Sequence, residues 1–124
     1  MLVRELMRRP LVTGKDIHLS EAARIMGEKR IGSLVLFSGG KIRGIITERD
    51  IVKNFGKGEK MSAVMAKRVV TIGPDETLDR ALGVMRKHGV KRLPVVAGRK
   101  LVGIITLTDI LANFEALEEE FFFE

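Results

Sequence analysis

A seven-residue phrase that occurs twice constrains the fold of this chain more than any other feature. The phrase Gly-Ile-Ile-Thr-x-x-Asp spans residues 44–50 and returns 59 residues later, at residues 103–109. Its Gly-Ile-Ile run is apolar and β-branched, which favours a strand. The Thr then stands where a helix N-cap belongs, and the Asp falls in the first helical turn. Each copy therefore predicts a strand that runs directly into a short helix.

The duplication extends well beyond this phrase. Residues 16–55 and 75–114 align without a gap, and 15 of these 40 positions are identical. Such internal similarity indicates a duplicated supersecondary unit, and each copy has the pattern strand, helix, strand, strand, helix. The predicted class is α/β. Repeat 1 covers residues 1–60 with a linker at 56–60, and repeat 2 covers residues 61–124 with an acidic, Phe-rich tail at 115–124.

The size of the repeats predicts how they are used. Neither repeat is long enough to bury a good core alone. We therefore expect the two repeats to pack together about a pseudo-twofold axis, which would form two equivalent clefts between them. Ligand sites are common at such seams.

The Thr-x-x-Asp part of the phrase has two interpretations. It can be a capping box, with Asp in place of the usual Glu. It can also be a ligand site, because a helix N-terminus suits a phosphate and a carboxylate can accept two hydrogen bonds from a vicinal diol such as a ribose. The presence of two copies in register favours the ligand interpretation.

Composition limits the environment and the partners. The chain contains no Cys, so disulfides and thiolate metal sites are excluded. It has no apolar run of membrane-span length and no long apolar stretch of the kind found in secretory signals, so we expect a cytoplasmic protein without a membrane partner. The net charge of +6 favours an anionic partner, either a small phosphate ligand or a nucleic acid.

The sequence shows no catalytic constellation. His18 and His88 stand apart from any second metal-ligating side chain, and no phosphate-binding loop of the Walker or GxGxxG type is present. We therefore expect no enzyme activity, no metal and no cofactor.

A basic nucleic-acid-binding module is the alternative function. The absence of Trp and Tyr argues against it, because few side chains remain on which bases could stack.

Both repeats resemble the cystathionine β-synthase (CBS) domain, and the chain resembles a stand-alone tandem pair, or Bateman module. The resemblance rests on the doubled phrase, on Arg92-Leu93-Pro94-Val95, and on the Ala-x-x-x-Met helices at Ala22/Met26 and Ala81/Met85. It implies a regulatory module that senses an adenosyl effector such as AMP, ADP, ATP or S-adenosylmethionine. It also implies a homodimer and, since no effector domain is evident, a regulated target that is a separate protein.

The resemblance also implies the ligand residues. Each cleft would take a ribose-binding Asp and a phosphate-binding Thr from one repeat, and would hold the adenine with backbone and apolar groups of the other. The first cleft would use Val12, Ile31, Gly32, Ser33, Arg92, Ile104, Thr106 and Asp109. The second cleft would use Ile45, Thr47, Arg49, Asp50, Val70, Val90, Lys91 and Arg92.

The two copies differ inside the phrase, so the clefts are expected to differ in affinity. Arg49 would favour a phosphate-bearing ligand at the Asp50 site, whereas Leu107 would tolerate a less charged one at the Asp109 site.

The tail adds three consecutive residues, Phe121–Phe123, which would be a liability on a monomer if they were exposed. We expect them to form a dimer contact or a frayed terminus.

Overall fold

The computed structural model describes residues 1–113, so the predicted role of the Phe-rich tail lies outside the described residues. The chain forms two compact units. We call residues 10–69 the Asp50 unit. We call residues 1–9 together with residues 70–113 the Asp109 unit, and each unit is described by itself.

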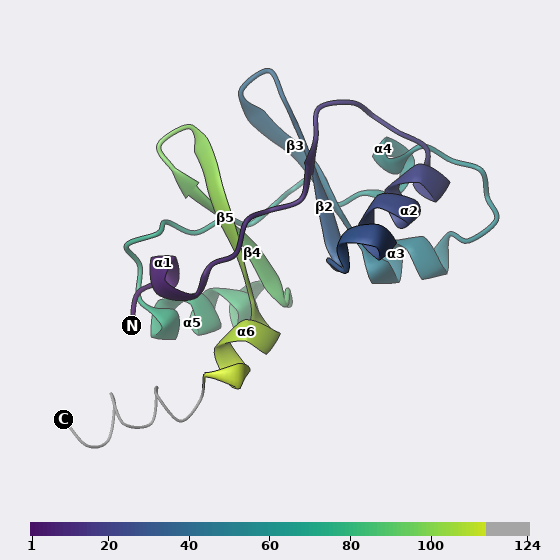
Figure 1. Ribbon diagram of the computed structural model, residues 1–124. Helices are drawn as coiled ribbons and strands as arrows, with labels where there is room; N and C mark the ends of the chain where they lie inside the picture. Colours follow the sequence, from purple (N-terminus) through teal and green to yellow (C-terminus); the bar gives the residue numbers. More distant parts are fainter. Residues whose placement is uncertain (114–124) are drawn as a thin grey trace. The chain divides into compact units, whose positions relative to one another are not determined.

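The Asp50 unit has a small mixed sheet with helices (Figure 1). Its sheet order is β1-β2-β3, in which β1 is parallel to β2 and β2 is antiparallel to β3. The elements are β1 (Val12–Thr13), α2 (Leu19–Lys29), β2 (Ser33–Ser38), β3 (Lys41–Thr47), α3 (Glu48–Lys53) and α4 (Met61–Val64). The buried core contains Leu19, Ala22, Met26, Leu34, Leu36, Ile46 and Met61. Leu19, Ala22 and Met26, spaced three and four residues apart, therefore form the buried face of α2.

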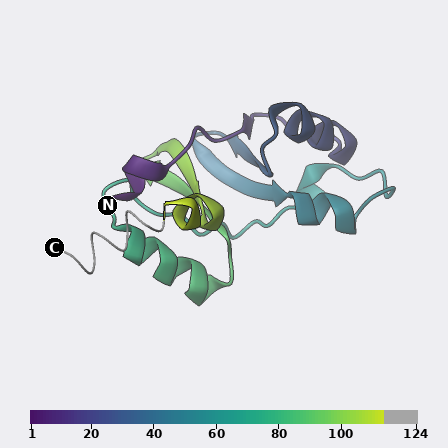
Figure 2. The ribbon, with the colours of Figure 1, turned by 60° about the horizontal axis from the view of Figure 1, so that its bottom comes forward.

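The Asp109 unit repeats this plan with a shorter sheet. Its elements are α1 (Val3–Leu6), α5 (Leu78–His88), β4 (Arg92–Ala97), β5 (Lys100–Thr106) and α6 (Leu107–Ala112). The first strand of the pattern is reduced here to a single parallel bridge between Ile72 and Val95. In the Asp50 unit the N–H of Val35 donates to the carbonyl of Leu11 at 2.9 Å, but the matching residue of β4 is Pro94, which has no N–H, so this bond is missing and the strand does not extend. Figure 2 shows α6 beside α5, at the end of β5.

The compact units do not coincide with the sequence repeats. Residues 1–9 belong to the Asp109 unit, and residues 61–69 belong to the Asp50 unit, so each repeat gives its leading segment to the unit formed mainly by the other. The division at residue 60 therefore describes the repeats but not the units. The physical reason is burial, because Val3 and Met61 are each fully buried in the core of the unit that they join.

Backbone hydrogen bonds fix both exchanged segments. In the Asp109 unit, the N–H of Val3 donates to the carbonyl of Glu76 at 2.8 Å. In the Asp50 unit, the N–H of Met61 donates to the carbonyl of Ile17, also at 2.8 Å. The exchange thus follows the same pattern in both copies.

A polar contact strengthens the attachment of α4. The carboxylate of Asp16 accepts hydrogen bonds from the backbone N–H of Ser62, at 2.9 Å, and from its hydroxyl. These bonds, that from the hydroxyl above all, hold the pKa of the Asp16 carboxyl below its ordinary value of 3.8. At the equivalent place in the Asp109 unit, an ion pair joins Arg4 to Asp75.

Asp16→Asn should lower the free energy of unfolding by about 1 kcal/mol near neutral pH, where the carboxylate is charged. Because the pKa of Asp16 is lower in the folded state, this stabilisation is complete above pH 3.8 and is lost as the pH falls through the folded value. Urea denaturation of both proteins across this range measures the difference. A difference between variant and wild type that does not shrink in acid would contradict the assignment. Ser62→Ala is the control that removes the same side-chain bond from the other partner.

Candidate functional site

The predicted ligand residues Thr106 and Asp109 lie together where β5 meets α6. The Thr106 hydroxyl donates to Oδ2 of Asp109 at 2.8 Å and accepts from the Asp109 N–H at 3.1 Å. Asp109 is the one buried charged residue among residues 1–113, with 9% of its surface exposed. Its second oxygen, Oδ1, accepts a hydrogen bond from Nε of Arg8 at 2.9 Å. The carboxylate is therefore held rigidly at the start of the helix.

Thr47 and Asp50 form the corresponding pair where β3 meets α3. Oδ2 of Asp50 accepts from the Thr47 N–H at 2.9 Å and from its hydroxyl at 3.2 Å. Within residues 1–113, no side chain takes the place that Arg8 has beside Asp109, and Oδ1 of Asp50 has no hydrogen-bond partner there. The capping box predicted from the phrase is thus confirmed at α3. At α6 the Thr106 side chain caps the helix, but Asp109 bonds to the Thr106 hydroxyl instead of its backbone N–H, so the box is not reciprocal. Capping leaves room for the ligand interpretation, because the cap does not use Oδ1.

Each unit brings the loop before its hairpin to the start of its short helix. In the Asp50 unit, Ser33 pairs with Thr47, and the carbonyl of Gly32 accepts from the N–H of Glu48 at 3.1 Å. In the Asp109 unit, Arg92 pairs with Thr106, and the carbonyl of Lys91 accepts from the N–H of Leu107 at 2.8 Å. In each unit, the loop residues that were predicted as ligand contacts therefore lie next to the Thr of the same repeat.

The remaining predicted residues divide between the units. The Asp50 unit holds Val12, Ile31, Gly32, Ser33, Ile45, Thr47, Arg49 and Asp50. The Asp109 unit holds Val70, Val90, Lys91, Arg92, Ile104, Thr106 and Asp109. Each predicted cleft draws on both lists, so the clefts stay predictions.

Ile45 and Ile104 have less to offer a ligand than the resemblance implies. Both side chains are buried. The backbone N–H and C=O of Ile45 are bridged to Ala66, and those of Ile104 are bridged to Arg8, all at 2.9–3.0 Å. These two positions therefore serve chiefly to anchor the exchanged segments to the sheets.

Arg8 is a site residue that sequence reasoning missed. Nothing in the local pattern connects it to a carboxylate 101 positions away. The only available signal was an asymmetry between the repeats, since Ala66 holds the matching place in the second copy. A basic residue at one copy alone indicates that the two Thr–Asp sites differ.

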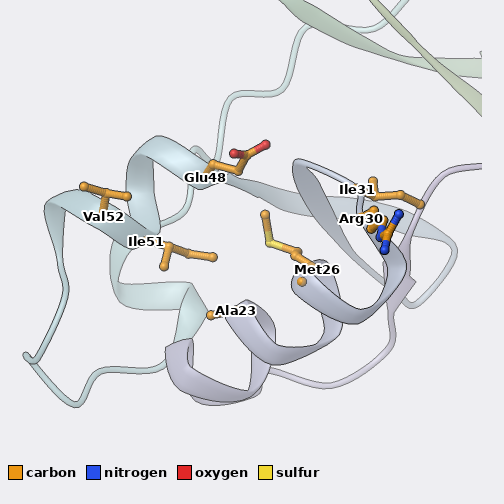
Figure 3. Close-up of a pocket in the computed structure, with 8 residues that line it drawn as sticks. Ala23, Met26, Arg30, Ile31, Glu48, Ile51 and Val52 are labelled. Atoms are coloured by element: carbon orange, nitrogen blue, oxygen red, sulfur yellow. The ribbon is translucent and has the colours of Figure 1, made fainter.

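Each unit also has an apolar groove between its two main helices. In the Asp50 unit it is lined by Ala23, Met26, Gly27, Arg30, Ile31, Glu48, Ile51 and Val52. Figure 3 shows Met26 and Ile51 pointing into the space between α2 and α3. The groove of the Asp109 unit is lined by Asp79, Leu82, Gly83, Met85, Arg86, Gly89, Val90, Lys91 and Leu107. Neither Asp50 nor Asp109 lines a groove, so the grooves are separate from the Thr–Asp pairs.

Residues 1–113 contain no group of three or more His, Asp or Glu side chains that could hold a metal ion. No helix among them has the length and apolar character needed to cross a bilayer.

Comparison with known protein sequences places the chain in a family. The model of the CBS domain matches residues 3–57 and again residues 61–116. The CBS domain-containing protein YhcV of Bacillus subtilis is 32% identical over 100 residues, which cover 77% of this chain and 71% of YhcV. Homoserine O-acetyltransferase of Methanohalobium evestigatum is 37% identical over 112 residues, which cover 87% of this chain. The match spans only 23% of that enzyme's length.

Solved structures agree with this placement. The CBS domain pair of protein MJ0100, determined in complex with 5′-methylthioadenosine and S-adenosyl-L-methionine, superposes with a TM-score of 0.86 at 32% identity, covering 94% of this chain and 98% of that one. The CBS-domain protein ATU1752 of Agrobacterium tumefaciens gives a TM-score of 0.82 at 30% identity, covering 92% and 99%. The resemblance seen in the sequence is confirmed, and this chain belongs to the CBS domain family, with two copies of the domain.

Proposed function

We propose that this chain is a regulatory module that binds an adenosyl ligand through its Thr–Asp pairs. The observation that carries the proposal is the pair Thr106 and Asp109, repeated as Thr47 and Asp50, in which one buried or half-buried carboxylate is held at a fixed place by a neighbouring hydroxyl. A carboxylate so held accepts hydrogen bonds from both hydroxyls of a ribose. The similarity to the MJ0100 domain pair, which binds two adenosine compounds, supports this class of ligand.

The two pairs are proposed to prefer ligands of different charge. Arg49 is exposed in the first turn of α3, one residue before Asp50. Its guanidinium suits a phosphate, so AMP, ADP or ATP is the expected class there. Leu107 and Thr108 follow Thr106 in the other unit and carry no charge. Ligands such as 5′-methylthioadenosine or S-adenosylmethionine are proposed at Asp109.

The proposed output is regulation rather than catalysis. Binding would favour one conformation of the module over another, and a target that reads this difference would be regulated. The target is proposed to be a separate protein, and the module is proposed to be a homodimer. Apolar side chains exposed at Val52 and Phe55, on α3 and just beyond it, support a further contact surface.

Calorimetry with 5′-methylthioadenosine, S-adenosylmethionine, AMP and ATP tests the ligand class. Asp109→Ala and Asp50→Ala should each weaken binding at one site, and the double variant should bind at least about tenfold more weakly, a loss of about 1.4 kcal/mol. Asp79→Ala is the matched control, because it removes an exposed carboxylate from the first turn of another helix in the same unit as Asp109.

Circular dichroism of each variant checks folding, since the loss of a cap alone can cost about 1 kcal/mol of stability. If the double variant Asp50→Ala/Asp109→Ala binds adenosyl ligands as tightly as the wild type, the proposal is wrong. A protein that ignores all four compounds but binds an oligonucleotide in a salt-dependent way would be a nucleic-acid module instead.

A further inference from the structure

The contact between Arg8 and Asp109 makes the two Thr–Asp sites chemically unlike. In the Asp109 unit, Oδ2 of the carboxylate is engaged by Thr106 and Oδ1 by Arg8. In the Asp50 unit, Thr47 engages only Oδ2, and Oδ1 has no partner among residues 1–113. A diol that approaches Asp109 therefore meets a guanidinium on the oxygen that stands free in the other copy.

Arg8 is held in place by its backbone rather than by its side chain. Its N–H donates to the carbonyl of Ile104, and its carbonyl accepts from the N–H of Ile104, each at 2.9 Å. This bridge lies two residues before Thr106 on β5, and Val3 anchors the same segment in the core of the unit. The folded unit therefore positions the Arg8 guanidinium next to the Asp109 carboxylate.

The side-chain contact itself is weak enough to be displaced. Only Nε of Arg8 reaches the carboxylate, and the Arg8 side chain is 75% exposed. The Asp109 side chain is only 11% exposed, so salt screens this pair less than a fully exposed one, but the exposed guanidinium regains contact with water when it leaves the carboxylate. A ligand hydroxyl can therefore replace the guanidinium on Oδ1.

We propose that Arg8 is a specificity-determining residue whose guanidinium competes with the ligand diol for Asp109. The inference rests on the proposed function and deepens it. A neutral nucleoside must displace the Arg8 guanidinium from Oδ1 and has no anionic group with which that guanidinium could form a new ion pair. A ligand with a phosphate can accept hydrogen bonds from the released guanidinium, so the displacement of Arg8 costs it less binding free energy. Arg8 therefore opposes the tolerance for uncharged ligands that Leu107 provides at this site.

The test uses the full chain with Asp50→Ala as background, so that only the Asp109 site binds. Calorimetry with 5′-methylthioadenosine, which carries no net charge, avoids a salt effect on the ligand. Adding Arg8→Ala should tighten binding about two- to fivefold, because the carboxylate no longer has to release a solvent-exposed guanidinium. Adding Arg9→Ala should leave affinity unchanged, because this neighbouring exposed arginine has no ion pair within the described residues. With AMP, the gain from Arg8→Ala should be smaller.

Salt gives an independent readout. Raising KCl from about 50 mM to about 500 mM should strengthen binding of the neutral nucleoside when Arg8 is present, and should have no effect in Arg8→Ala. Weaker or unchanged binding in Arg8→Ala, in a protein whose binding still requires Asp109, would overturn the competition and leave the proposed function standing. If 5′-methylthioadenosine and AMP both bind equally well without Asp109, the proposed function fails, and the role of Arg8 fails with it.

Discussion

Met61→Ala is expected to lower the free energy of unfolding by about 2–5 kcal/mol, the range for truncating a buried methionine. Met61 is fully buried and belongs to the cluster that also contains Leu19, Leu34 and Ile46. The side chain is delivered from the second sequence repeat into the core of the unit built mainly from the first. Its loss should therefore leave a cavity beneath β2 and β3, and urea denaturation measures the cost.

Hydrogen exchange locates that cost. Amides of β2 and β3 should lose protection in Met61→Ala, while those of β4 and β5 should change less, since Met61 is absent from the core of the Asp109 unit. Met61→Leu nearly conserves volume and should cost less than about 1.5 kcal/mol. Loss of protection confined to β4 and β5 would mean that the leading segments are not exchanged between the repeats.

Gly44→Ala is expected to cost about 1–3 kcal/mol, because the added methyl group has no room. A Cβ at Gly44 would lie 2.4 Å from Sδ of Met65 and 2.9 Å from the carbonyl oxygen of Ala66. The methionine can move, but that carbonyl accepts the N–H of Ile45 at 3.0 Å in the bridge that holds the exchanged segment. The backbone must therefore shift, and this glycine is required by close approach rather than by its φ angle.

Two other glycines provide matched controls. Gly103→Ala should cost less than Gly44→Ala, because its nearest contacts are all side-chain atoms of Met7, at 2.7–3.1 Å. Gly27→Ala should instead stabilise by about 0.5–1 kcal/mol, since this glycine is within α2 and has nothing within 4 Å of an added Cβ. Denaturation of the three variants under one condition ranks them. A Gly44→Ala protein as stable as wild type would contradict the close packing of residues 65–66 on β3.

The structure gives the duplicated phrase two compatible roles. In both units the Thr and Asp side chains bond to each other and cap a six-residue helix. The same contacts hold a carboxylate in one orientation, which is what a site for a vicinal diol needs. Duplication thus yields two similar carboxylates, and the leading segment that carries Arg8 makes one of them different.

Local sequence patterns were sufficient to predict most of the secondary structure and to identify which residues form the Thr–Asp pairs. The helices marked by the Ala-x-x-x-Met pattern are Leu19–Lys29 and Leu78–His88, and the two consecutive strands of each predicted repeat are β2–β3 and β4–β5. These elements follow from hydrophobic periodicity, tight glycine turns and capping chemistry, all of which act over a few residues. The contacts between Thr106 and Asp109 span only three positions, so the sequence alone could indicate them.

Only the tertiary structure decided which leading segment joins which core and what Arg8 touches. The repeats suggested a division at residue 60, but composition does not assign Val3 or Met61 to either core, since both are apolar residues at the start of similar four-residue helices. The choice depends on fitting a side chain into a particular cavity and on the bridges at Ile45 and Ile104. Such contacts join residues far apart in the chain, and no local periodicity records them.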